Sequence, residues 1–228
     1  MNSMRVIFIM ATIAAMTLVG CSTPQQVSPP SHIRSTDHGS PCCGSSQHRP
    51  SRRDIVRTAA KLVGASTVRV NGKRIQYDCA GVTRAIFLTH GIDLYDSDVA
   101  DPKANGVRLI HAHISRYGRF HRGPAVRPGD LVFFDNTWDA NGDGIANDPL
   151  THVGIVERQE PDGTIVFISR VSNAIERYRM NLGLPDVHFT AEGKVLNDYL
   201  RRKDRNHPLG TGYLTGQLFA GFGTRNGL

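Results

Sequence analysis

The stretch Tyr-Asp-Cys-Ala-Gly at residues 77–81 begins an apolar helical pattern, and two strand-like motifs follow it along the chain. These motifs are Gly-Asp-Leu-Val-Phe-Phe at residues 129–134 and Thr-His-Val-Gly-Ile-Val at residues 151–156. Their β-branched and aromatic residues are typical of buried strands. Helices that precede strands along the chain predict an α+β domain, with N-terminal helices packed on an antiparallel sheet.

Apolar residues at helical spacing predict three helices, and apolar runs after them predict three strands. The helices are expected at residues 51–64, 79–90 and 107–117, and the strands at residues 131–134, 153–157 and 164–169. An Asn-Gly pair at residues 71–72 predicts a tight turn. This arrangement places Cys79 at the start of the second helix and His152 beside the start of the second strand.

A cysteine becomes a nucleophile at neutral pH when a nearby base removes its proton, and Cys79 and His152 supply these two groups. Asp78 is the predicted N-cap, so the unpaired N–H groups and the dipole of the helix favour the Cys79 thiolate. Taken singly, Cys79 is more typical of a small buried hydrophobe, and His152 of a polar residue at a strand end. The order of the motifs favours a thiol hydrolase.

The three motifs resemble those of the NlpC-type papain-fold peptidoglycan hydrolases, over roughly residues 52–175. Asp-Cys-Ala-Gly is similar to that family's Asp-Cys-Ser-Gly nucleophile motif, and the other two are similar to its Gly-Asp-Leu-Val-Phe-Phe strand and its His-Val-Gly-Ile segment. The resemblance implies a small papain-like domain that hydrolyses amide bonds in cell-wall peptides. It implies Cys79 as nucleophile, His152 as general base and no cofactor in the chemistry. Tyr77 and Asp78 are expected at the substrate site.

Two positions depart from the family's pattern. Ala80 replaces its serine, which leaves the Cys79 backbone N–H able to donate to an oxyanion. On the strand after the base, the family has a third polar residue that fixes the imidazole tautomer, and this position is Ser169 here. Because serine is short, we expect reduced activity, or activity that relies on another group such as Asn173 or the backbone.

The resemblance implies cleavage of the peptidoglycan stem peptide near D-glutamate and diaminopimelate. One alternative is a catalytically weakened member that binds wall peptides without cutting them. A second is a CHAP-type amidase or an acyl-transferring relative of the same fold. A third is a calcium-stabilised scaffold of the cell envelope.

Residues 139–148, Asp-Ala-Asn-Gly-Asp-Gly-Ile-Ala-Asn-Asp, resemble the first half of an EF-hand-type calcium loop. Oxygen ligands recur at alternate positions, and a glycine stands at the sixth. Leu150 replaces the glutamate at position twelve, so Asn147 or Asp148 would have to close the site. The alternative is a solvated acidic turn, because Asp, Asn and Gly dominate turns. The candidate ligands of this structural calcium are Asp139, Asn141, Asp143, the carbonyl of Ile145, and Asp148.

The first residues have the layout of an export signal, with Arg5 ahead of an apolar run over residues 6–19. This run is shorter than the roughly 20 apolar residues that span a membrane. It ends in Leu-Val-Gly-Cys at residues 18–21, which resembles the lipobox of bacterial lipoproteins. The resemblance implies that residues 1–20 are removed and that Cys21 is lipidated. The serine that follows then favours the outer membrane, facing the periplasm. The alternatives are an ordinary cleaved signal and a short anchor.

Residues 21–50 are rich in Ser, Pro, Gln and His, which predicts a disordered tether in which Cys42 and Cys43 are exposed thiols. Residues 51–228 suit one domain with a single core. The net charge of +7 is spread along the chain without a basic, aromatic-interleaved stripe, so no nucleic-acid partner is expected. The expected partners are peptidoglycan and, through the lipidated cysteine, the membrane. The oligomeric state is not fixed by the sequence, and we expect a monomer.

Overall fold

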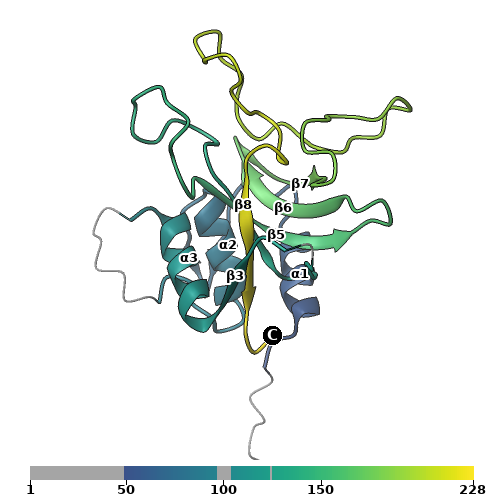
Figure 1. Cartoon of the computed structure of the whole chain (residues 1–228). Coiled ribbons are helices and arrows are strands. Elements are labelled where there is room, and N and C mark those ends of the chain that lie inside the picture. Colours follow the sequence, from purple (N-terminus) through teal and green to yellow (C-terminus); the bar gives the residue numbers. More distant parts are fainter. Residues whose placement is uncertain (1–48, 97–103, 124) are drawn as a thin grey trace, which may run out of the picture. The chain divides into compact units, whose positions relative to one another are not determined.

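Three helices pack against one face of a six-stranded antiparallel sheet, which confirms the predicted α+β class (Figure 1). The computed structural model describes residues 49–96, 104–123 and 125–228. The predicted signal, the lipidation of Cys21 and the tether thiols Cys42 and Cys43 fall outside the described residues and stay predictions. Within the described ranges, no helix has both the length and the apolar character to cross a bilayer.

The helices begin and end close to the predicted residues, and the sheet contains three strands that the sequence did not predict. The helices are α1 (Arg52–Lys61), α2 (Cys79–Leu88) and α3 (Gly106–Tyr117). The strands are β1 (Arg69–Val70), β2 (Lys73–Arg74), β3 (Gly118–His121), β4 (Leu131–Phe134), β5 (His152–Gln159), β6 (Ile165–Val171), β7 (Ala174–Met180) and β8 (Phe219–Arg225). The order in the large sheet is β3-β8-β4-β5-β6-β7, and β1 pairs with β2 in a separate hairpin. Asn71 and Gly72 turn this hairpin with positive φ, as the Asn-Gly pair predicts.

Local sequence explains where each helix begins. Ser51 and Asp54 form a reciprocal capping box at α1. Asp78 caps α2, because its side chain accepts a hydrogen bond from the Gly81 N–H, and Asn105 caps α3 in the same way. Each cap fixes the first turn of its helix, and at α2 this first turn carries Cys79.

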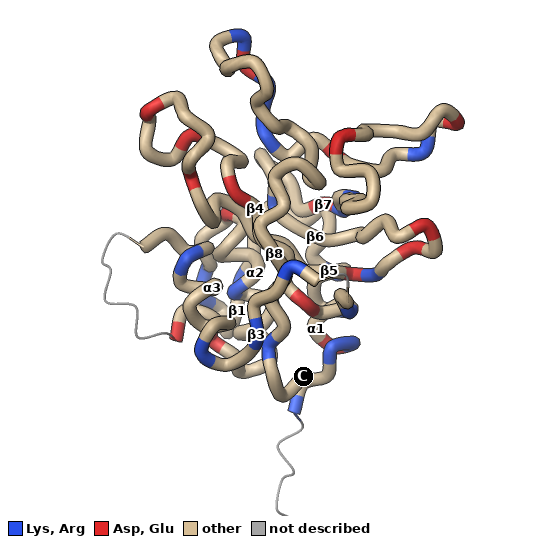
Figure 2. The backbone as a smooth tube through the Cα atoms, in the orientation of Figure 1, with Lys and Arg blue, Asp and Glu red and all other residues tan. Residues whose placement is uncertain are grey.

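Alternating side chains of the sheet fill two apolar clusters, one on each face. In β4, Leu131 and Phe133 contact the helices, whereas Val132 and Phe134 join the cluster on the opposite face. The opposite face is covered in part by the segment before β8, from which Leu200 and Leu218 are buried. In Figure 2, basic and acidic residues are interspersed along the described elements. The sheet is therefore buried on both faces near its centre, where β4 and β5 pair.

Asp130 of the Gly-Asp-Leu-Val-Phe-Phe motif ties the first helix to the last strand. This carboxylate is fully buried and accepts hydrogen bonds from Arg52 Nη1 at 2.6 Å, Thr224 Oγ1 at 2.9 Å and the Arg127 N–H at 2.9 Å. A buried carboxylate is tolerated only when it is paired and hydrogen-bonded in this way. The motif residue therefore has a structural role in joining α1, β4 and β8.

We expect Asp130→Asn to lower the free energy of unfolding by about 2 to 3 kcal/mol, because the amide carries no charge for Arg52 and turns a donor toward the Arg127 N–H. Urea denaturation followed by circular dichroism would measure the change. The control is Asp204→Asn, an exposed position whose local hydrogen bond an amide oxygen can keep, and we expect less than about 0.5 kcal/mol there. Equal effects at both positions would contradict the structural role of Asp130.

Candidate active site

Cys79 is the first residue of α2, and the chain immediately before it folds back closely over the first helical turn. A Cβ atom placed on Gly81 would lie 2.1 Å from the Gln76 carbonyl oxygen, so only glycine fits there. The Asp78 cap accepts the Gly81 N–H at 2.7 Å. Together these contacts hold the Cys79 thiol at a fixed helix end.

His152 is the first residue of β5 and pairs with Phe134 in the neighbouring β4. Its side chain is buried, and its ring centroid lies 6.1 Å from that of Phe134. Cys79 and His152 both line one cavity of about 310 Å³, which we call the thiol cavity. Asp78, Thr151, Trp138 and Arg202 also line it, together with Arg170 and a few neighbours. The structure therefore brings the predicted thiol and the predicted base to the same cavity.

Ser169, in the middle of β6, contacts the imidazole directly. Its Oγ lies 2.8 Å from His152 Nε2 and donates its hydrogen to the Val153 carbonyl oxygen at 2.7 Å. A serine hydroxyl has one hydrogen, and a carbonyl can only accept. Because that hydrogen is committed to Val153, Nε2 must be the donor to Ser169. This arrangement selects the tautomer of His152 that is protonated on Nε2 and leaves the lone pair of Nδ1 available as a base.

Gly154 explains how a short serine can reach the ring. It lies on β5 opposite Ser169, and a Cβ atom there would approach Phe167 Cδ2 to 2.7 Å and Ser169 Cβ to 3.2 Å. A side chain at this position would displace β6 from β5 or move Ser169. The glycine of the His-Val-Gly-Ile segment thus allows the close contact between the hydroxyl and the imidazole.

The pKa of the Cys79 thiol is higher than its position at a helix N-terminus alone would suggest. Burial raises the pKa of the Cys79 thiol to about 11, with a smaller contribution from the charge of Asp78 and an opposing one from hydrogen bonding of the Val153 backbone. The backbone N–H groups of Cys79 and Ala80 at the helix end lower the pKa in the expected direction, but loss of hydration outweighs them in the resting site. Cys79 rests as a neutral thiol at neutral pH.

Burial, with a smaller contribution from the positive charge of Arg170, lowers the pKa of His152 to about 3. The imidazole is therefore neutral across the physiological range and has its lone pair free. A neutral thiol beside a neutral base supports proton transfer during nucleophilic attack rather than a preformed ion pair.

No protein-family model matches the chain. A curated gamma-D-glutamyl-L-lysine dipeptidyl-peptidase of Bacillus cereus (strain ATCC 10987 / NRS 248) is 23% identical over 132 residues, or 58% of this chain. The chain is a distant relative of that peptidase. It spans only 33% of the peptidase's length. A crystal structure of the P60 domain of an antigen from M. avium subspecies paratuberculosis is 14% identical with a TM-score of 0.33, over 55% of this chain and 82% of that one.

The two expected substrate residues have different positions. Asp78 lines the thiol cavity, whereas Tyr77 is outside its lining, and the Tyr77 hydroxyl donates to the Ala65 carbonyl oxygen. The guanidinium carbon of Arg170 lies 5.0 Å from the centre of the Tyr77 ring. Tyr77 therefore supports a side chain of the cavity wall, and whether it contacts substrate stays a prediction.

The candidate calcium loop is exposed and organised by its own side chains. Asp139 accepts from the Gly142 and Gly144 N–H groups, and Asp143 accepts from the Ile145 N–H and from the Asn147 side-chain amide. Asn141 also donates to Asp143 and Asn147, whereas Asp148 lies apart, buried beside Asn136. In the described ranges, no group of three or more His, Cys, Asp or Glu side chains is placed to hold a metal ion. Calcium binding by this loop stays a prediction.

The side chains of the thiol cavity that sequence reasoning missed include Trp138, Arg170 and Arg202. Arg170 carried a usable signal, because it interrupts the apolar run of β6 directly after Ser169. Trp138 and Arg202 lie on long loops, and no local pattern indicates that these loops meet at the cavity. Asn173, considered as a substitute orienting group, lines a neighbouring cavity instead.

Proposed function

We propose that this protein is a cysteine peptidase that cleaves amide bonds in peptidoglycan stem peptides. The observation that carries the proposal is the imidazole of His152, held by Ser169 in one tautomer at the cavity that also contains Cys79. The distant relationship to a dipeptidyl-peptidase acting on a gamma-D-glutamyl bond supports the choice of substrate. The expected bond follows D-glutamate and precedes a diamino acid, such as diaminopimelate.

In the proposed reaction, Cys79 Sγ attacks the scissile carbonyl carbon while His152 Nδ1 takes the thiol proton. The Cys79 backbone N–H donates to the oxyanion, as the first free donor of a helix end can do. The imidazolium returns its proton to the departing amine nitrogen, and a thioester remains on Cys79. Nδ1 then removes a proton from water, whose oxygen attacks the thioester, and Sγ leaves with the proton from the imidazolium.

Digestion of purified sacculi tests this function, with the products identified by mass. We expect soluble muropeptides from the wild-type protein and none from Cys79→Ala, whose fold should be unchanged because only one sulfur atom is removed. The product masses name the cleaved bond and separate an endopeptidase from an amidase of CHAP type. Retention on sacculi without any cleavage would instead support the weakened, wall-binding alternative.

The proposal also includes a location in the cell envelope and a calcium ion in the loop of residues 139–148. A wall substrate places the protein in the cell envelope, and the lipobox-like residues 18–21 support attachment through Cys21 to the outer membrane. The loop of residues 139–148 leads directly into Thr151 and His152, so a bound calcium ion would stiffen the chain next to the base.

A further inference from the structure

The thiol cavity is lined by three charged side chains, namely Asp78, Arg170 and Arg202. The oxygens of Asp78 are already engaged, since Oδ1 accepts from the Gly81 N–H and Oδ2 accepts from Gln76 Nε2. His152 adds no positive charge near neutral pH, because burial lowers its pKa. The two arginines therefore leave the cavity with a net positive charge.

Arg170 is fixed in place but has no anionic partner. Its guanidinium stacks on the Tyr77 ring, which is itself held through its hydroxyl by the Ala65 carbonyl oxygen. Its Nε is buried and has no hydrogen-bond partner, and no carboxylate within the described residues forms an ion pair with it. A buried donor without a partner is costly, so a group that enters the cavity and accepts from it would be favoured.

Arg202 is exposed and stands where three cavities meet. It lines the thiol cavity, the cavity beside Trp138 and the cavity beside Ser172 and Asn173. No hydrogen bond or ion pair joins its guanidinium to another residue in the part of the chain that the structure describes. The cavity thus has a second unpaired guanidinium at its rim.

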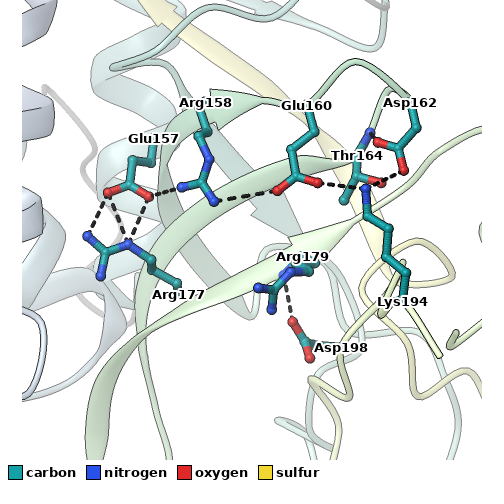
Figure 3. Close-up of polar contacts among 9 residues, drawn as sticks. All are labelled: Glu157, Arg158, Glu160, Asp162, Thr164, Arg177, Arg179, Lys194 and Asp198. Atoms are coloured by element: carbon teal, nitrogen blue, oxygen red, sulfur yellow. Dashed lines mark hydrogen bonds and ion pairs between the residues drawn. The ribbon is translucent and has the colours of Figure 1, made fainter.

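Two other arginines of the same sheet, Arg158 and Arg177, are paired with carboxylates. Figure 3 shows the Arg177 guanidinium paired with the Glu157 carboxylate, with Arg177 Nη2 2.8 Å from Glu157 Oε1. Arg158 lies between Glu157 and Glu160 and pairs with both. Lys194 bridges Glu160 and Asp162 in the same network. Arg170 and Arg202 differ from these two arginines because they line the same cavity without a carboxylate partner, and Arg170 Nε is buried there without an acceptor, which points to an anion supplied from outside the chain.

We infer that Arg170 and Arg202 bind a free carboxylate of the peptide substrate next to the scissile amide, and so select acidic peptides over their amidated forms. This inference rests on the proposed function and names the chemical feature that the site recognises. A guanidinium presents several N–H donors in a fork that fits a carboxylate, and a carboxamide offers only one oxygen and no charge. The stacked Arg170 supplies the oriented contact, and Arg202 closes over the ligand from the rim.

The test is a binding measurement that needs no turnover. The sole tryptophan of the chain, Trp138, lines the thiol cavity, so its fluorescence can report ligand binding to the full chain carrying Cys79→Ala. The probes are two synthetic stem peptides that differ only in one group, a free α-carboxylate on D-glutamate or the corresponding carboxamide. We expect the carboxylate form to bind at least about tenfold more tightly, as charge-assisted hydrogen bonds imply.

Adding Arg170→Gln or Arg202→Gln to that protein should bring the ratio of the two dissociation constants close to one. Arg170→Lys should keep part of the preference, because it keeps the charge but loses the fork. Arg158→Gln, on the same sheet outside the cavity, is the matched control and should leave the ratio unchanged. Equal affinity for both peptides, no binding of either, or a ratio insensitive to both cavity variants would overturn the inference. Sacculus digestion by the wild-type protein would in those cases still stand as a separate result for the proposed function.

Discussion

Replacing His152 by alanine should lower kcat/KM on a stem peptide about a thousandfold at neutral pH. The reason is the resting state of the thiol, whose pKa burial raises to about 11. Without a base, only about one thiol in ten thousand is ionised at pH 7. The Nδ1 lone pair of His152 removes this limit in the wild-type protein, and general-base catalysis of this kind contributes roughly a hundred- to ten-thousandfold.

The pH dependence of the two proteins should differ in a defined direction. The raised thiol pKa means that Cys79 is protonated below it, so the His152→Ala rate should rise about tenfold per pH unit as the thiolate forms. In the wild-type protein the pKa of His152 is lowered to about 3, so the base is already deprotonated and kcat/KM should be nearly flat from about pH 5 to about pH 9.

Initial rates on a synthetic stem peptide across this pH range provide the measurement, and thermal unfolding at each pH shows that the variant remains folded. His188→Ala is a suitable control, since that imidazole bonds the Asn197 carbonyl oxygen away from the thiol cavity. A flat profile for His152→Ala, or full activity at neutral pH, would show that another group deprotonates Cys79.

Removing the Ser169 hydroxyl should lower kcat roughly 30- to 100-fold with little change in KM. In Ser169→Ala, His152 Nε2 loses its acceptor, and the ring is free to adopt the tautomer in which Nδ1 carries the proton. That tautomer cannot accept the thiol proton at Nδ1. The loss is expected to be smaller than for His152→Ala, because the productive tautomer remains accessible part of the time.

Imidazole ¹⁵N chemical shifts of His152 separate this positioning role from a structural one. The wild-type protein should show protonated Nε2, and Ser169→Ala should shift both ring nitrogens toward averaged values. Thr164→Val is the matched control, because it removes another buried hydroxyl, bonded to Asn181 just before β6. We expect it to lower stability while leaving kcat and the His152 shifts unchanged. Unaltered His152 shifts in Ser169→Ala would contradict the assigned role of the hydroxyl.

The parts of the fold that could be predicted are those whose sequence patterns are local. Helical periodicity located α1, α2 and α3, with Asp78 as the predicted cap of α2, and apolar runs located β4, β5 and β6. Strand β8 was not predicted because Gly221 and Gly223 weaken its strand pattern. Both glycines are required by distant side chains, since a Cβ on Gly221 would lie 2.3 Å from the Phe120 ring and one on Gly223 would meet Phe133. Strand β7 was not predicted because charged residues occupy part of its exposed face and interrupt its apolar pattern.

In the candidate site, too, the residues within local motifs could be predicted, whereas properties that depend on distant segments could not. Cys79 and His152 were recognisable because each begins an element with a typical motif, and Ser169 because it ends the apolar part of β6. The resting charge of the thiol was not predictable, since burial depends on segments that are distant in sequence. The net positive charge of the thiol cavity likewise depends on Arg202. This residue lies on a loop, and the loop's sequence does not indicate that it reaches the cavity.

The place of β8 between β3 and β4 has a consequence for how the chain folds. The hydrogen bond from Thr224 to Asp130 joins residues 94 positions apart, and the pairing of β8 with β4 is similarly non-local. Contacts of such sequence separation form slowly, because a long loop must close before they stabilise anything. The thiol, the imidazole and Ser169 are all synthesised before this strand, which completes the centre of the sheet. A nascent chain therefore carries every reactive group without the framework that aligns them, and it should acquire its chemistry only once β8 has paired with β4.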